Sequence, residues 1–293
     1  MTELLISPSR LMTAADKQEW LIFDVRHDLS DHQAGRRAYE QGHIPGAVFL
    51  DHETQLSAPR TGRNGRHPLP DLAEFTALMH RMGVRPDTGV VAYDASGGAF
   101  AAHLWWMLRW MGHQHVAVLD GGWQAWLAAG GRVEVGSSAG GDAGQTSSDP
   151  ALCGRAGPEA VPHMPTVDVN AVMAILERPA FTIIDARSPE RYRGEVEPID
   201  PVAGHIPGAV NRPNSLNLQA DGRFKPAGQL RKEFVELLGQ TEPGRVVHQC
   251  GSGITACHNL FAMELAGLKG SALYPGSWSE WCADPSRPVG RAV

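Results

Sequence analysis

A cysteine at the end of an apolar run carries the clearest chemistry in this sequence. Cys250 follows the predicted strand Val246–His248 and precedes Gly251, Ser252, Gly253 and a predicted helix that starts at Ile254. Backbone N–H groups and the positive end of the helix dipole converge at such a turn, which favours the thiolate form of a cysteine. Glycines allow a tight loop to curl around the sulfur. The spacing predicts a nucleophilic cysteine; an inert buried thiol is the alternative.

The elements that position this loop occur twice in the chain. The segment Gly42–Val48 is identical to Gly204–Val210 over seven residues, and each follows an Asp-x-Arg sequence. Gly136–Pro162, between the copies, is rich in Gly, Ser and Pro and is typical of a linker. We therefore expect an N-terminal domain over residues 1–135, a linker over 136–163 and a C-terminal domain over 164–293.

Each copy alternates short apolar runs with helical patterns. This alternation predicts an α/β fold made of two tandem domains, each an open parallel sheet with helices on both faces. Loops at the carboxyl ends of the strands form the sites in such sheets, and the cysteine loop is one of these. The predicted strands cover residues 21–25, 90–93, 116–119, 181–184, 246–248 and 272–274, and the predicted helices cover 71–82, 99–111, 169–177, 228–238 and 254–266.

The first copy has no cysteine at the corresponding position. Asp94 faces Cys250 when the two copies are compared. A carboxylate cannot serve as the thiolate nucleophile that the cysteine loop predicts. We therefore expect one active domain and one degenerate domain, which is free to supply part of the substrate pocket.

The tandem copies, the repeated Gly-His-Ile-Pro-Gly-Ala-Val and the Cys-Gly-Ser-Gly-Ile-Thr-Ala loop together resemble the two-domain rhodanese-like sulfurtransferases. Within that superfamily the loop is most similar to that of 3-mercaptopyruvate sulfurtransferases. The resemblance implies that a small-molecule donor passes sulfur to Cys250, which forms a persulfide, and that pyruvate is released. The acceptor would be a thiol, such as thioredoxin or a low-molecular-weight thiol, or cyanide. No metal or organic cofactor is implied.

The resemblance also implies roles for individual catalytic residues. Cys250 matches the sulfur-accepting nucleophile, and Ser252 matches a loop serine that hydrogen-bonds near it. His67 matches a first-domain histidine that approaches this serine together with an acidic residue. The acidic position falls at Glu53, with Asp51 as a competing choice.

The substrate-binding residues implied by the resemblance include one departure from the family pattern. Arg191 matches an arginine that holds the substrate's carboxylate, and a guanidinium fork suits that group. A second substrate arginine would fall at about Asp200, where the charge is opposite, so Arg193 or Arg212 are candidates to replace it. The loop residues that surround the transferred sulfur are Gly251, Gly253, Ile254 and Thr255.

Other polar residues near these motifs have structural interpretations. Arg26 and Arg187 each follow a strand-end Asp by two residues in both copies, which predicts structural ion pairs. His43 and His205, shared by the two copies, are expected to donate hydrogen bonds that organise turns. Cys257 lies about two helical turns beyond the reactive cysteine and is expected to be a core thiol.

Composition narrows the function classes. The formal net charge is −6, which disfavours an overall nucleic-acid-binding surface. The sequence has no apolar run long enough to cross a membrane and no secretion signal at its start, so the cytoplasm is the expected compartment. Its four cysteines form no Cys-x-x-Cys pair for structural zinc.

Three other functions remain to be weighed. A thiosulfate:cyanide sulfurtransferase uses the same chemistry with another donor, and a non-enzymatic sulfur-carrier or docking module would turn over poorly. A phosphatase of related fold needs an arginine six residues after the cysteine, where this chain has Ala256.

Overall fold

The computed structural model describes residues 3–15, 20–136, 161–177 and 181–291. The chain forms two compact units, and their division differs from the expected domains in one segment. The first unit comprises Met1–Leu56 and Pro70–His163, and the second comprises Ser57–Leu69 and Met164–Val293. Residues 57–69, which the sequence assigns to the first copy, therefore pack with the second unit. Most of the expected linker, including Cys153, lies outside the described residues.

The first unit contains a parallel sheet of five strands in the order β1-β5-β4-β2-β3 within its described residues. Helices α1 and α5 cover one face, where their side chains share a core with alternate residues of β2, β4 and β5. The elements are β1 (Leu5–Ile6), α1 (Pro8–Ala15), β2 (Trp20–Asp24), α2 (Ala34–Gln41), β3 (Val48–Phe49), α3 (Leu72–Arg81), β4 (Gly89–Tyr93), α4 (Ala99–Trp110), β5 (Val116–Leu119) and α5 (Gly122–Ala128).

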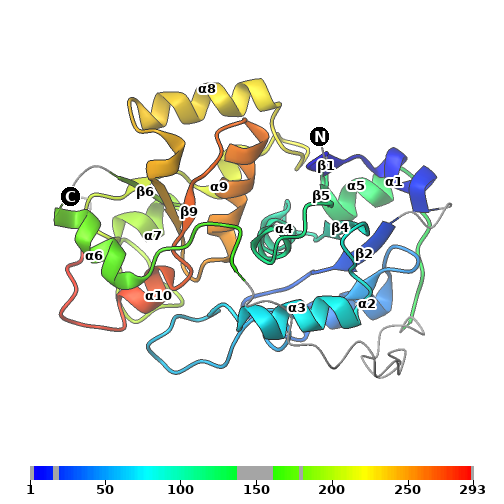
Figure 1. Cartoon of the computed structure of the whole chain (residues 1–293), viewed down its shortest axis with the longest axis horizontal. Helices are drawn as coiled ribbons and strands as arrows, with labels where there is room; N and C mark the ends of the chain where they lie inside the picture. The colour runs from blue at the N-terminus through cyan, green and yellow to red at the C-terminus, as the bar shows by residue number, and fades with distance from the viewer. Residues whose placement is uncertain (1–2, 16–19, 137–160, 178–180, 292–293) are drawn as a thin grey trace. The chain divides into compact units, whose positions relative to one another are not determined.

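The second unit contains a parallel sheet in the order β7-β6-β8-β9. Its elements, with two short 3-10 helices η2 and η3, appear in Figure 1 between green and red. They are α6 (Val169–Glu177), β6 (Thr182–Asp185), α7 (Pro189–Arg193), β7 (Val210–Asn211), η2 (Asn214–Asn217), α8 (Ala227–Leu238), η3 (Pro243–Arg245), β8 (Val246–Gln249), α9 (Ile254–Leu265), β9 (Ala272–Leu273) and α10 (Ser277–Trp281).

Helices cover both faces of the second sheet. Successive side chains of a strand point to opposite faces, so neighbouring residues of one strand pack against different helices. Ile183 and Val247 pack with α6 and α10, whereas their neighbours Ile184 and Val246 pack with α8 and α9. Figure 1 shows α8 and α9 together on one side of these strands and α6 with α10 on the other. The predicted α/β fold with two open parallel sheets is confirmed.

Equivalent polar contacts fix the strand ends in both units. Arg26 pairs with Asp24 at 2.6 Å, and Arg187 pairs with Asp185 at the same distance, which confirms the predicted structural ion pairs. The Nδ1 atom of His43 lies 2.8 Å from a backbone carbonyl oxygen in its unit, and that of His205 lies 2.7 Å from one in its own. These histidines organise the repeated turns, as predicted.

Among the residues that the structure describes, no helix combines the length and the apolar character that a membrane crossing requires.

Candidate functional site

The sulfur of Cys250 lies in a cradle of main-chain amides. The residue directly follows β8 and is almost fully buried, at 1% exposure. Its Sγ atom accepts hydrogen bonds from the backbone N–H of Gly253 at 3.1 Å and of Ser252 at 3.5 Å. Helix α9 begins at Ile254, directly after these donors, so its positive end adds to the same field. The arrangement can stabilise negative charge on sulfur.

The glycines of this loop have distinct steric reasons. Gly253 has φ +89°, and a Cβ atom there would lie 2.6 Å from the carbonyl oxygen of Pro275. A Cβ atom at Gly251 would instead lie 2.7 Å from Nη2 of Arg66 and 3.5 Å from both terminal nitrogens of Arg191. Gly253 therefore shapes the cradle, and Gly251 leaves room for two guanidinium groups beside it.

Ser277 supports the cysteine backbone from a strained conformation. The backbone N–H of Cys250 donates to the hydroxyl of Ser277 at 3.1 Å, and that hydroxyl donates to the carbonyl oxygen of Tyr274 at 2.9 Å. Ser277 has φ +52°, which costs a residue with a side chain about 1–2 kcal/mol. Strain of this kind persists where the surroundings over-determine it, which is typical of functional sites.

A serine and a histidine from distant parts of the sequence meet in the second unit. Ser252 Oγ and His67 Nδ1 lie 2.8 Å apart, and both side chains are buried. The contact is possible because residues 57–69 belong to this unit. The pair can pass a proton between a hydroxyl and an imidazole next to the cradle.

Two arginines share two carboxylates next to the loop. Nη2 of Arg191, on α7, lies 2.7 Å from Glu197 and 3.3 Å from Asp200, and Arg66 also pairs with Asp200. Burial alone would raise the pKa of Glu197, but hydrogen bonds from Arg191 and from the Asp200 N–H outweigh it and hold that pKa below its usual range. Both guanidinium groups are mostly buried but keep some exposure, so they can also reach an anionic substrate.

Comparison with known proteins identifies the family. The model of the Rhodanese-like domain matches residues 7–129 and again residues 168–284. The chain belongs to the rhodanese-like family. A Pseudomonas aeruginosa protein named as a probable 3-mercaptopyruvate sulfurtransferase is 46% identical over 97% of this chain and 97% of its own length. The rhodanese-like protein described here is thus a sulfurtransferase with two domain copies.

Two further relatives of this sulfurtransferase carry related names. A Mycobacterium tuberculosis protein named for thiosulfate sulfurtransferase activity is 42% identical over 93% of this chain and 91% of its own length. The crystal structure of SseA from Escherichia coli, described as a 3-mercaptopyruvate sulfotransferase, covers 94% of this chain and 99% of its own, with a TM-score of 0.76 and 29% identity. The names of these relatives include both donors.

The equivalent loop of the first rhodanese-like unit holds a permanent carboxylate. One oxygen of Asp94 accepts hydrogen bonds from the N–H groups of Ser96 at 2.8 Å and Gly98 at 2.9 Å. The other accepts from those of Phe100 at 2.8 Å and Ala101 at 2.9 Å. The side chain thus fills the amide cradle of its own loop. That the first copy is degenerate stays a prediction.

The structure brings together most of the predicted site residues, apart from Glu53. The predicted set gathered around the loop is Cys250, Gly251, Ser252, Gly253, Ile254, Thr255, His67 and Arg191. Glu53 belongs to the first unit, where its Oε1 lies 3.1 Å from His32 and 3.5 Å from His27. Its role as the acidic partner of His67 stays a prediction, as does the catalytic role of that histidine.

The sequence analysis did not single out Arg66, the second arginine that lies beside the loop. Of the two candidates for this role, Arg193 pairs with Glu195 on the surface and Arg212 pairs with Glu233. Arg66, immediately before the predicted histidine, is the residue that reaches the loop instead. The reversed charge at Asp200 was the available signal, because a buried carboxylate calls for a cation nearby.

Ser277 was also missed, although the repeat carries a signal for it. The equivalent residue of the first copy is Gly122, which has φ +58°. Glycine adopts a positive φ without strain, whereas a serine does not. The second copy thus keeps a side chain at a position where the backbone strain favours glycine.

The other described cysteines are poor nucleophiles. Burial raises the pKa of Cys257 well above its ordinary value, and the neighbouring Cys250 adds to this effect. Burial also raises the pKa of Cys282 to about 11. Both thiols are therefore protonated near neutral pH, and Cys257 is a core thiol, as predicted.

Proposed function

We propose that this sulfurtransferase takes sulfur from 3-mercaptopyruvate, carries it as a persulfide on Cys250 and passes it to a thiol or to cyanide. The observation that carries the proposal is the pair of backbone N–H groups that donate to Sγ of Cys250. They can hold an anionic sulfur both before and after it gains a second sulfur atom.

In the first half-reaction the Cys250 thiolate attacks the sulfur of the donor. A bond forms between the two sulfur atoms while the bond from the donor's sulfur to its C3 carbon breaks. The electron pair of the broken bond passes to the carbon fragment as pyruvate enolate. Ser252 would deliver the proton that converts the enolate into pyruvate, and its 2.8 Å contact with His67 supports this role.

The donor's carboxylate is the group that Arg191 and Arg66 would bind. Both guanidinium groups border Gly251, whose missing side chain leaves room for a ligand beside the loop. Arginine suits a carboxylate because its planar fork presents parallel donors. Asp200 and Glu197 hold the two guanidinium groups in position while the donor is absent.

In the second half-reaction an acceptor thiolate, or cyanide, attacks the outer sulfur of the persulfide. The bond between the two sulfur atoms breaks, and its electron pair returns to Cys250 as thiolate. Thioredoxin or a low-molecular-weight thiol would serve as acceptor. The cytoplasm is the compartment we propose, because thiols are kept reduced there.

Mass spectrometry of the intact protein, with measurement of released pyruvate, tests this function. We expect 3-mercaptopyruvate to add one sulfur atom to Cys250 and to release one pyruvate per protein, and an acceptor thiol to remove the added sulfur. Cys250→Ser should abolish both signals, and Cys257→Ser, the matched control for a buried thiol, should retain them. Sulfur that appears on Cys257, or pyruvate release that persists in Cys250→Ser, would contradict the proposal.

Thiosulfate is the competing donor, and the name of the Mycobacterium tuberculosis relative supports it. The two donors are separated by the ratio of their kcat/KM values with the same acceptor. A persulfide formed from thiosulfate alone would reverse the choice of donor while leaving the role of Cys250 intact.

A further inference from the structure

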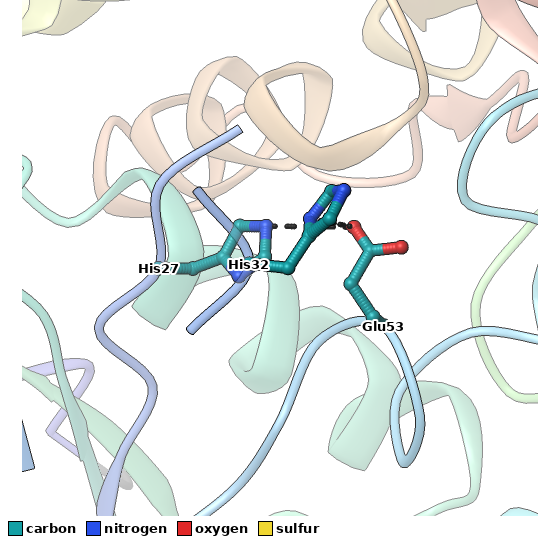
Figure 2. Close-up of side chains that lie close together, drawn as sticks. All are labelled: His27, His32 and Glu53. Atoms are coloured by element: carbon teal, nitrogen blue, oxygen red, sulfur yellow. Dashed lines mark ion pairs between the residues drawn. The ribbon is translucent and has the colours of Figure 1, made fainter. Parts of the chain in front are cut away.

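We propose that His27, His32 and Glu53, in the first unit, form a binding site for one divalent transition-metal ion of the Zn²⁺ class. Oε1 of Glu53 lies 3.1 Å from Nδ1 of His32 and 3.5 Å from Nε2 of His27. One ligand atom from each residue lies within 4.8 Å of the others. Figure 2 shows the two imidazole rings and the carboxylate directed toward one another. This inference does not depend on the proposed sulfur-transfer mechanism.

The sheet topology brings the ligands together. His27 follows β2 by three residues, and Glu53 follows β3 by four. These strands are parallel neighbours, paired at Asp24 and Phe49, so both loops leave the same edge of the sheet. This edge holds the sites in open parallel sheets, and in the first copy Asp94 stands where the second copy has Cys250.

Local hydrogen bonds hold two of the ligand-bearing loops in shape. Oδ1 of Asp51 accepts from the backbone N–H of Glu53 at 2.8 Å and of Thr54 at 3.1 Å. Oδ1 of Asp28 accepts from the backbone N–H of Ser30 at 2.8 Å, within the loop that leads to His32. A metal would therefore meet ligands whose backbones are already ordered.

The two distances that join Glu53 to the histidines match those around a tetrahedral ion, and the two histidine ligand atoms lie within 4.8 Å of each other. Bonds of about 2.1 Å to nitrogen and oxygen ligands place neighbouring ligand atoms roughly 3.4 Å apart. The distances of 3.1 and 3.5 Å need little adjustment to reach that value. Two imidazoles and one carboxylate leave a fourth position for water, and this donor set favours Zn²⁺, Co²⁺ or Ni²⁺ over Mg²⁺ and Ca²⁺.

Access and packing also suit a metal. The side chain of His32 is half exposed, which gives an ion a route from solvent. The ring of His27 packs edge-on against Phe100, with centroids 5.3 Å apart, and this contact fixes its orientation.

Cobalt and zinc titrations of the untagged protein test the site. The Cys250→Ser variant is the parent for these titrations, because it removes the reactive thiolate as a competing ligand. We expect one equivalent of Co²⁺ to give visible d–d absorption, and Zn²⁺ to displace it. His32→Ala and Glu53→Gln in this parent should weaken binding at least tenfold, whereas His80→Ala, which removes an exposed histidine elsewhere in the same unit, should leave binding unchanged.

His32→Ala is the decisive variant because its side chain is exposed and its loss spares the core. Circular dichroism of each variant verifies that the fold is retained. A parent protein that binds no Co²⁺, or a His32→Ala protein that binds as tightly as the parent, would overturn the inference. Because these readouts do not use turnover, they separate this site from any catalytic role of Glu53.

Discussion

Exchanging the partners of the Arg66–Asp200 ion pair tests how the site recognises a carboxylate. The guanidinium of Arg66 borders the loop at Gly251, and that of Arg191 lies 3.5 Å from the point where a Cβ atom of Gly251 would stand. A hydrogen bond between a charged group and its partner contributes about 1.5–3 kcal/mol. Arg66→Ala should therefore lower kcat/KM for 3-mercaptopyruvate by roughly 10- to 150-fold.

The double variant Arg66→Asp with Asp200→Arg keeps the ion pair and the net charge. It places the guanidinium at position 200, where the family pattern expects one. We expect it to recover kcat/KM to within about tenfold of the parent, whereas Arg66→Asp alone should be more impaired than Arg66→Ala, because it sets two carboxylates side by side.

Pyruvate release, followed with a coupled dehydrogenase across donor concentrations, measures these effects as KM and kcat. Arg63→Ala is the matched control, because Arg63 is an exposed arginine of the same segment. Thermal unfolding of each variant separates loss of binding from loss of fold. If Arg66→Ala keeps kcat/KM within twofold of the parent, or if the double variant is as impaired as Arg66→Asp, the reasoning is refuted.

Three further perturbations test the cradle and its strand. Ser277→Gly relieves about 1–2 kcal/mol of backbone strain but loses two hydrogen bonds of about 1 kcal/mol each, so the unfolding temperature should change little. Alkylation of Cys250 by iodoacetamide should slow, because the backbone of the cysteine loses its support from Ser277. Equal alkylation rates would contradict this role. Gly253→Ala places a Cβ atom against Pro275 at φ +89° and should lower both the unfolding temperature and persulfide formation; retention of both would count against the steric argument. Burial lowers the pKa of His248 to about 3. Below the ordinary histidine pKa of about 6.5, the unfolded chain therefore binds a proton at this residue that the folded chain does not bind. The free energy of unfolding should fall by up to about 1.4 kcal/mol per pH unit as the pH is lowered from 6.5 toward 4. The unfolding free energy of His248→Leu, measured by urea unfolding at each pH, should depend less steeply on pH than that of the parent. An unchanged pH dependence would exclude this histidine as the cause.

The sequence predicted the long buried elements well because their periodicity is local. The strands at 90–93, 116–119 and 246–248 and the helices at 99–111 and 254–266 differ from the structure by only a residue or so at their ends. The two-residue strands β1, β3 and β7 were missed, since pairing with a neighbouring strand stabilises them rather than their own composition.

The reactive loop could be read from the chain, but its partners could not be derived from local pattern. Cys250 and its glycines are contiguous, so their spacing already implies the cradle. Ser252 and His67 are 185 residues apart, and only the resemblance to a family suggested their contact. Arg66 escaped notice because the segment that carries it belongs to the second unit, although in sequence it lies within the first copy.

The two amide cradles differ in whether the anionic group that they bind stays the same during the reaction. In the first unit the anion is covalently part of the chain, so that loop keeps its electrostatic balance whatever passes through the enzyme. In the second unit, under the proposed function, the anion would be the reacting sulfur itself, and its size and charge distribution would change at each turnover. Resistance of the second unit to heat should consequently vary with the sulfur load on its cysteine, while that of the first stays constant.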